Sequence, residues 1–343
     1  MDRADHEIQA DVVLLGGRVY SVDQSGQETH ARAVVIRGGK ILCCGTDEEA
    51  VRFIGPQTKR IDLGGKMVLP GFADVHNHPQ AMATAIFALD LYPYASKEEY
   101  LEAVALWKAE NPDCRYIMGN GWSLPNLANH YPDKRELDAV CPDIPAALFD
   151  TSHHVLWANS KAMENANITK ETPDPPGGVI GRNEAGEPTG IFSEDAATSL
   201  IMNAFPDFNV SQYKIAIREY QRMSNSYGIT LAQDCLLIPG SNAIEAYKEL
   251  AREGLLTMRF RGTYAASPAV DGGRYKGTEE ASAEFDRFIA DVADRRQQDR
   301  VDDLFQINAI KLFEDGGGPT SYLKEPFEGT ADCGQPIWPE EQL

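Results

Sequence analysis

Two histidines, His76 and His78, stand one residue apart directly after the apolar stretch that begins at Leu69. Residues i and i+2 of a strand point to the same side, so both imidazoles could meet at one cation where the strand ends. Imidazole is a common ligand of zinc. The alternative is a surface loop that carries two histidines by chance. Because the 343-residue chain holds only 7 histidines, the spacing favours a metal site.

The same stretch resembles a known family. Pro-Gly-Phe-x-Asp-x-His-x-His, residues 70–78, is similar to the first barrel strand of the metal-dependent amidohydrolase superfamily. Later segments resemble its YtcJ-like branch, the amidohydrolase-3 type, which includes N-substituted formamide deformylases. The resemblance implies an α/β fold, a TIM-type (β/α) barrel beside a small β-sandwich. It also implies one or two divalent metal ions at the barrel mouth, with zinc as the expected ion.

A lysine lies near the end of another predicted strand, residues 305–313. Lys311 precedes Asp315, and the segment matches the YtcJ-like pattern Lys-x-Phe-x-Asp-Gly. An ammonium group donates hydrogen bonds and cannot accept them, so a metal role requires reaction with carbon dioxide to give an anionic carbamate. The resemblance implies this metal role for Lys311 and a substrate-binding role for Asp315. An ordinary surface lysine and an unmodified lysine that anchors substrate remain the alternatives.

Three further candidates lie between these segments. The run Ser-His-His-Val-Leu-Trp-Ala-Asn-Ser, residues 152–160, resembles the YtcJ-like motif Asp-Gly-His-x-x-Trp-x-Asn-Ser, with His154 at the motif histidine and Ser152 in place of the aspartate. Gly-Trp-Ser, residues 121–123, resembles Gly-Trp-Asp, again with serine for the acid. The resemblance implies a catalytic or substrate-positioning role for His154 and substrate contacts from Trp122 and Glu194. The two serines indicate a less acidic pocket than is usual in this branch.

The elements that would position these residues divide the chain into four parts. Residues 1–69 carry apolar runs bounded by glycine pairs, which predicts hairpins of a small sheet, the N-terminal part of the β-sandwich. These glycine pairs do not match a phosphate-binding loop that opens a helix. Residues 70–87 hold the first barrel strand and the metal motif. Residues 88–206 are irregular and predict an inserted, substrate-covering subdomain, and residues 207–343 hold barrel strands two to four with their helices.

Within the last part, strands are predicted at 229–234, 258–262 and 305–313. Helices are predicted after Ser211, after Ser241 and at about 279–295, with serine as the expected N-cap of the first two. Asp234 would end the second strand and orient loops. Strand and helix alternate, as a parallel barrel requires.

Four βα units cannot close an eight-stranded barrel, so the barrel is expected to be incomplete. The superfamily supplies further metal histidines and a catalytic aspartate from later strands, and no histidine follows His154. We therefore expect the first portion of a longer protein or a truncated product, inactive on its own. Its exposed strand edges would favour aggregation or pairing. A half-barrel with a purpose of its own is the alternative.

The composition excludes several partners. A formal net charge of −20 argues against nucleic acid and anionic membrane surfaces. No apolar run reaches the length of a membrane span, and the polar first residues lack a signal-peptide core. The six cysteines show no Cys-x-x-Cys spacing, which is typical of reduced thiols in a cytoplasmic protein. A homo-oligomer is compatible with the sequence.

Two functions follow as hypotheses. The first is a metal-dependent hydrolase that cleaves a C–N bond in a small-molecule amide, formamide or cyclic amide by means of metal-activated water. The second is a non-catalytic truncated product or half-barrel that needs a partner or a complementary segment in order to fold.

Overall fold

The computed structural model describes residues 9–22, 28–175, 177–266, 290, 292, 294–312, 322–327 and 333–334. Contacts divide the chain into two units, Met1–Phe72 and Ala73–Leu343. Most of the helix predicted at 279–295, together with Asp315, lies outside the described residues. Among the described helices, none combines the length and the apolar character needed to cross a bilayer.

The first unit contains two small sheets. One has the order β5-β4-β1-β6, and the other has the order β3-β2-β7. Their strands are β1 (Val12–Leu15), β2 (Arg18–Val22), β3 (Glu28–Ala31), β4 (Ala33–Arg37), β5 (Lys40–Gly45), β6 (Lys59–Asp62) and β7 (Met67–Val68), with one helix, α1 (Asp47–Val51). The predicted hairpin turn at Gly38 and Gly39 is confirmed, because both residues have φ in the left-handed region, at 56° and 71°. This tight turn requires such angles, which glycine adopts without strain.

The second unit contains a sheet of the order β17-β16-β15-β8, formed by β8 (Phe72–Asn77), β15 (Ile229–Leu237), β16 (Arg259–Ala266) and β17 (Phe305–Leu312). β15, β16 and β17 are parallel neighbours. The Sγ atom of Cys235 contacts the Val75 carbonyl at 3.9 Å, and Gln80 Nε2 donates to the Leu236 carbonyl at 2.8 Å. β8 and β15 therefore run in the same direction, and the C-terminal ends of both strands lie at one edge of the sheet.

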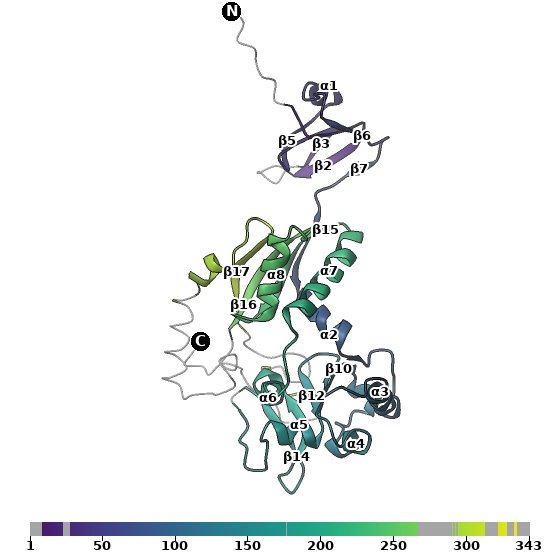
Figure 1. The fold of residues 1–343 in the computed structure, drawn as a ribbon, viewed down its shortest axis with the longest axis vertical. Coiled ribbons are helices and arrows are strands. Elements are labelled where there is room, and N and C mark those ends of the chain that lie inside the picture. The colour runs from purple at the N-terminus through teal and green to yellow at the C-terminus, as the bar shows by residue number, and fades with distance from the viewer. Residues whose placement is uncertain are drawn as a thin grey trace, which may run out of the picture. The chain divides into compact units, whose positions relative to one another are not determined.

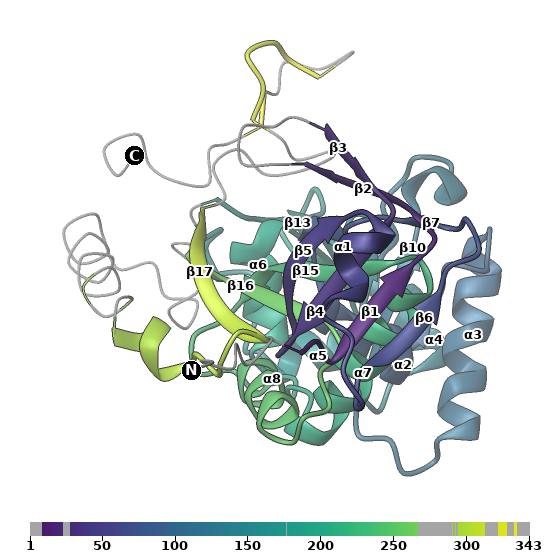
Figure 2. The same ribbon diagram turned by 90° about the horizontal axis from the view of Figure 1, so that it is seen from above.

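Helices α7 (Val210–Ser226) and α8 (Asn242–Arg252) pack along one side of this sheet (Figure 2). The core between α8 and the sheet is aromatic. The Tyr247 ring of α8 stacks on Phe305 of β17 at a centroid distance of 4.8 Å and contacts the Phe260 ring of β16 at 4.9 Å. All three side chains are fully buried. The alternation of strand and helix predicted for residues 207–343 is thus present in the described part of the chain.

The start of α7 differs from the prediction. Asn209, and not Ser211, is the N-cap: its side chain accepts from the Gln212 N–H, and the Gln212 side chain accepts from the Asn209 N–H. This reciprocal capping box satisfies two helix N–H groups at once, so it outcompetes a cap two residues later. Ser241 is the N-cap of α8, as predicted.

Asp234 does not end its strand, because β15 continues to Leu237. Its side chain is fully buried and accepts a hydrogen bond of 2.8 Å from the Tyr247 hydroxyl, which joins β15 to α8. Burial raises the pKa of the Asp234 carboxyl to about 7. The carboxyl thus serves the packing of the sheet against its helices.

The raised pKa of Asp234 predicts a pH-dependent term in stability. A folded-state pKa above the unfolded value means that the contribution is fully present below about pH 4 and is lost as the pH rises through about 7. The Asp234→Asn variant should remove this term, on the order of a few kcal/mol. Urea unfolding at pH 4 and pH 8 measures it, with Glu164→Gln as an exposed control. An equal stability difference between wild type and variant at both pH values would contradict the prediction.

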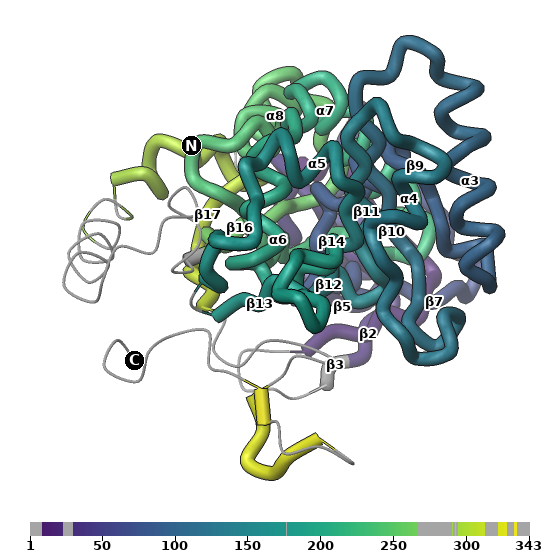
Figure 3. The backbone as a smooth tube through the Cα atoms, turned by 90° about the horizontal axis from the view of Figure 1, so that it is seen from below, coloured from purple at the N-terminus to yellow at the C-terminus, as the bar shows by residue number. Residues whose placement is uncertain are grey.

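Residues 88–206 form a six-stranded sheet of the order β13-β14-β12-β11-β10-β9. The tube in Figure 3 follows it from β9, beside α3, to β13. Its elements are α2 (Met82–Phe87), which precedes it, β9 (Leu89–Asp90), α3 (Lys97–Glu110), β10 (Ile117–Trp122), α4 (Lys134–Val140), β11 (Ala146–Asp150), β12 (Val155–Ala158), α5 (Ser160–Asn165), β13 (Val179–Arg182), β14 (Pro188–Ser193) and α6 (Glu194–Met202). Residues 88–206 therefore form a regular sheet that is accompanied by helices (Figure 1).

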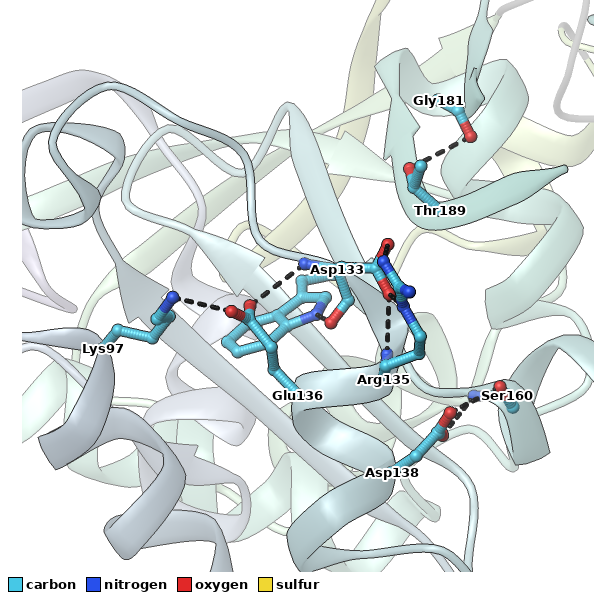
Figure 4. Close-up of polar contacts among 9 residues, drawn as sticks. Lys97, Asp133, Arg135, Glu136, Asp138, Ser160, Gly181 and Thr189 are labelled. Carbon is cyan, nitrogen blue, oxygen red and sulfur yellow. Dashed lines mark hydrogen bonds and ion pairs between the residues drawn. The ribbon is translucent and has the colours of Figure 1, made fainter. Parts of the chain in front are cut away.

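A group of polar contacts joins α3 and α4 to this sheet (Figure 4). Asp133 caps α4 and forms a capping box with Glu136, whose carboxylate also accepts from Lys97 of α3 at 2.6 Å. Trp157 of β12 donates its indole N–H to the Asp133 carbonyl at 3.2 Å. These bonds join the start of α4 to α3 and to β12.

Candidate metal centre and active site

His76 and His78 lie at the C-terminal end of β8. Their ring centroids are 5.7 Å apart, with an interplanar angle of 73°. His76 is exposed and His78 is half-buried. The segment between them is held by Asp74, whose carboxylate accepts from the Asn77 amide at 2.5 Å, while Asn77 Oδ1 accepts from the His78 N–H at 2.7 Å. The i, i+2 spacing thus brings both imidazoles to the same strand end, as predicted.

The state of His78 fits a metal ligand. Its Nδ1 atom is buried and has no hydrogen-bond partner among the described residues. Burial, followed by the charges of Lys311, His76 and His153, lowers the pKa of His78 to about 4. The imidazole is therefore neutral near pH 7, which is the form that binds metal ions. Among the described residues, no group of three or more His, Cys, Asp or Glu side chains is arranged to hold a metal ion.

Lys311 lies near the end of β17, where it is the register partner of Ala265 on β16. Its charge lowers the pKa of His78 and also acts on Asp195, so the ammonium lies near both groups. Lys311 and the two histidines thus follow strands of the same sheet, and a metal site shared by the three side chains stays a prediction. A carbamate at Lys311 would add an oxygen ligand to the two imidazoles.

The segment from Asp150 to His154 presents two histidines. Asp150 is buried, and both of its carboxylate oxygens accept from the Ser152 hydroxyl, at 2.9 and 2.7 Å. Ser152 Oγ in turn accepts from the His154 N–H at 3.1 Å, and Asp150 accepts from the Val155 N–H at 3.1 Å. This network builds the turn. Ser152, which replaces the aspartate of the motif, is thus paired with an aspartate two residues earlier.

His153 was not among the predicted site residues. Its Nε2 atom lies 3.3 Å from the Tyr92 hydroxyl, and its ring stacks on Phe149 at a centroid distance of 5.8 Å. The charge of His153 also acts on the pKa of His78. In the sequence, the available signal for His153 was its position next to His154. Only the three-dimensional fold shows that the two side chains have different contacts.

His154 pairs with Glu194, with 3.0 Å between Nδ1 and Oε2. The Glu194 N–H also donates to the His154 carbonyl at 2.8 Å. Glu194 is 6% exposed, has φ of 66°, and its Oε1 atom is buried without a partner among the described residues. The hydrogen bond that His154 donates to the Glu194 carboxylate raises the pKa of His154. The pair therefore favours the protonated form of the imidazole.

Replacing Glu194 with alanine should lower the pKa of His154. The hydrogen bond that stabilises the imidazolium is lost, while burial, which disfavours the charge, remains. NMR titration of the His154 ring protons measures the change. Glu187→Ala, which removes an exposed carboxylate paired with Lys170, is the matched control. An unchanged titration of His154 in Glu194→Ala would contradict the assignment.

Trp122, predicted to contact substrate, lies in the core. It is fully buried, it donates its indole N–H to the Leu148 carbonyl at 2.8 Å, and its ring meets Trp157 edge-to-face. The ring is enclosed by the core in this structure, where it supports the six-stranded sheet. Its predicted contact with substrate stays a prediction. Asp315 lies outside the described residues.

The amidohydrolase family model of the amidohydrolase-3 type matches residues 59–343. The chain belongs to the amidohydrolase family. This membership confirms the family predicted from the motifs at residues 70–78, 152–160 and 311–316.

Individual relatives agree with this membership. The chain is 30% identical over 320 residues to the amidohydrolase-type protein YtcJ of Bacillus subtilis (strain 168), with 91% of this chain and 56% of that protein covered. It is also 30% identical over 250 residues to the N-substituted formamide deformylase of Arthrobacter pascens, with 71% and 45% covered. The chain thus spans about half the length of these relatives.

Solved structures share the fold. A metal-dependent hydrolase from Pyrococcus furiosus has a TM-score of 0.61 at 24% identity, over 96% of this chain and 63% of the other. One from Pyrococcus horikoshii has a TM-score of 0.63 at 22% identity, over 96% and 61%. The amidohydrolase chain therefore shares an α/β fold with metal-dependent hydrolases.

Proposed function

We propose that the protein hydrolyses a C–N bond in a small-molecule amide, formamide or cyclic amide. The site would use one or two divalent metal ions, zinc being the expected ion, held by His76, His78 and carboxylated Lys311. The observation that carries this proposal is the pair of imidazoles at the C-terminal end of β8, 5.7 Å apart between ring centroids, with the buried and unpartnered Nδ1 atom of His78. Catalytic groups of βα-barrels lie at that end of the strands. Membership of the amidohydrolase family and the 30% identity to a formamide deformylase support the reaction class.

Each side chain of the proposed site would have a separate role. A bound divalent metal supplies Lewis-acid polarisation of the scissile carbonyl and lowers the pKa of water. His76 and His78 would hold the ion through ring nitrogens, and nitrogen ligands of this kind leave the charge of the ion undiminished. Protonated His154, fixed by Glu194, offers Nε2–H as a donor to a substrate oxygen. The unpaired Oε1 of Glu194 can accept from a substrate N–H, which agrees with the substrate-binding role predicted for this residue.

The proposal is tested by metal replacement in the full-length gene product. We expect hydrolysis of N-substituted formamides to stop after treatment with a chelator and to return on addition of Zn²⁺, Mn²⁺ or Co²⁺. Release of the amine is the readout. Hydrolysis that survives complete removal of metal, verified by elemental analysis, would contradict the proposal.

A second candidate is a half-barrel that pairs with a partner, a complementary segment or a second copy. The observation that favours it is the position of β8 at the edge of its sheet, with Val75 72% exposed. An exposed apolar edge strand pairs readily with another chain. The charge of the protein makes a nucleic acid partner unfavourable.

The exposed edge strand β8 predicts that copies of the isolated chain associate with one another. Val75→Lys should lower the associated fraction, because a lysine on an edge strand opposes pairing. Light scattering across a concentration series measures the change. Ile215→Lys on α7, where Ile215 is 52% exposed, is the control and should leave association unchanged. Equal association of wild type and Val75→Lys would exclude this edge as the contact.

A further inference from the structure

Asn77, the residue between the two histidines, is of a type that strands disfavour. β-Strands are enriched in β-branched and aromatic residues, and asparagine is depleted because its amide competes for backbone hydrogen bonds. Asn77 is nevertheless the last residue of β8, where its side chain is half-buried. A residue that opposes the local preference of its element is expected at a functional or strained site. The contacts of the Asn77 amide therefore indicate what this residue does.

His78 lies just beyond the end of β8. Its φ of −132° and ψ of 68° depart from strand geometry, in which ψ is about 115–135°. The alternation of a strand alone therefore does not hold the ring of His78 beside that of His76. Local hydrogen bonds fix the His78 main chain instead. Its carbonyl accepts from the Ala81 N–H at 2.9 Å, and its N–H donates to Asn77 Oδ1 at 2.7 Å.

The Asn77 amide joins this N–H to a carboxylate. Asn77 Nδ2 donates to Asp74 Oδ2 at 2.5 Å, and the other carboxylate oxygen, Asp74 Oδ1, accepts from the His76 N–H at 3.3 Å. The main-chain N–H groups of both histidines thus end on the same two side chains, which we call the Asp74–Asn77 pair. An amide suits this place because it offers a donor to the carboxylate and an acceptor to the N–H.

The Asp74–Asn77 pair also fixes the path of the backbone. In a flat strand, residues three apart point to opposite faces, so a direct bond between these two side chains requires the chain to twist between them. His76 stands on this twisted segment. The Val75 carbonyl, 3.9 Å from Cys235 Sγ, anchors the same segment to β15. The bond between Asp74 and Asn77 therefore determines how the His76 ring is turned relative to the sheet.

We propose that Asn77 is a positioning residue of the metal site, and that it sets the relative orientation of the His76 and His78 rings through Asp74 and the His78 N–H. The buried and unpartnered Nδ1 atom of His78 fits a ligand atom that is held ready in this way. Groups that orient metal ligands contribute about ten- to hundredfold to metal affinity. The inference rests on the metal site of the proposed function, and its test measures metal binding without turnover.

The test measures the affinity of the chain for Zn²⁺ by competition with a chelating dye. The double variant His76→Ala with His78→Ala gives the zinc that is bound elsewhere, which is subtracted. Asn77→Leu keeps the size of the side chain but offers no donor or acceptor, so it should weaken zinc binding about ten- to hundredfold. Asn203→Leu, at an exposed position after α6, is the matched control and should leave the affinity unchanged.

A double-mutant cycle separates positioning from a general loss of stability. Asn77→Ala, which adds no bulk, should weaken zinc binding by about tenfold or more in the wild-type background. In an Asp74→Ala background, where the pair is already broken, the same change should cost at most about twofold. Titrations well below the unfolding midpoint, with the fold verified by circular dichroism, compare folded proteins only, so a purely structural role of Asn77 would leave the affinity unchanged.

The possible outcomes distinguish the inference from the proposed function. Unchanged zinc affinity in folded Asn77→Ala, or equal effects of this change in the two backgrounds, would overturn the role of Asn77 and leave the metal site standing. Zinc binding by the wild type no stronger than by the histidine double variant would overturn the metal site itself. Absence of hydrolysis by the full-length gene product, with the cycle as expected, would overturn the proposed reaction and leave the role of Asn77 standing.

Discussion

A double variant with His76→Ala and His78→Ala should purify without bound metal and should lower turnover of the full-length gene product by at least about a thousandfold. The two imidazoles supply the neutral nitrogen ligands at the end of β8, and their ring centroids are 5.7 Å apart. Without them, the oxygen ligand of carboxylated Lys311 would be left alone at the site, which is too few ligands to hold a divalent ion. Elemental analysis after equilibration with zinc gives the stoichiometry, and a substrate assay gives the rate.

The control for this experiment is His130→Ala, an exposed histidine of the same unit. Circular dichroism and the unfolding midpoint establish that the double variant is folded. The variant should also be at least as stable as the wild type in the absence of metal, because it no longer buries the unpartnered Nδ1 of His78. A metal content equal to that of the wild type would refute the assignment of both histidines.

Replacement of Lys311 has the second-largest expected effect. Unmodified, its positive charge acts against His78 and would repel a cation from the motif. Carboxylation would reverse the sign of this charge and supply an oxygen ligand. We therefore expect Lys311→Ala to lose at least one equivalent of metal and to lower turnover by about a hundredfold or more. Lys311→Glu, which keeps an anionic oxygen at the same strand end, should retain more metal than Lys311→Ala.

Labelled bicarbonate distinguishes the two states of Lys311. Wild-type protein grown or incubated with carbon-13 bicarbonate should show a carbamate carbonyl signal by NMR, and the signal should be absent from Lys311→Ala. Lys40→Ala, at an exposed turn of the first unit, is the control that should keep the signal. A missing signal in metal-loaded wild type, together with full metal content in Lys311→Ala, would instead favour a lysine that anchors substrate.

Local sequence patterns were sufficient for the elements and for the family. The glycine pair before β5 predicted a hairpin, and apolar runs predicted β15, β16 and β17 to within a few residues. The motif of residues 70–78 predicted the amidohydrolase family, which the comparison confirms. These features depend on spacing along the chain, on φ angles that few residues adopt, and on side-chain alternation in a strand. They can therefore be read without knowing which segments meet.

The tertiary structure decided how deeply each predicted site residue is buried and which side chain it contacts. Trp122 and His154 were both inferred from motif positions, yet Trp122 is fully buried, while His154 pairs with Glu194, forty residues later in the chain. Burial depends on what packs against a strand, and the partners of β10 come from β9 and β11 on either side. Sequence spacing carries no information about such contacts.

His153 shows the same limit most clearly. In the sequence it is one of two adjacent histidines, and the motif assigned a role only to its neighbour. Its left-handed backbone turns the ring toward Tyr92 and Phe149, while His154 faces Glu194. The sequence by itself predicted a metal site after β8 from two histidines that stand one residue apart. Only the fold determined which side chains surround that site, because they come from strands far apart in the chain that pairing and packing bring to one place.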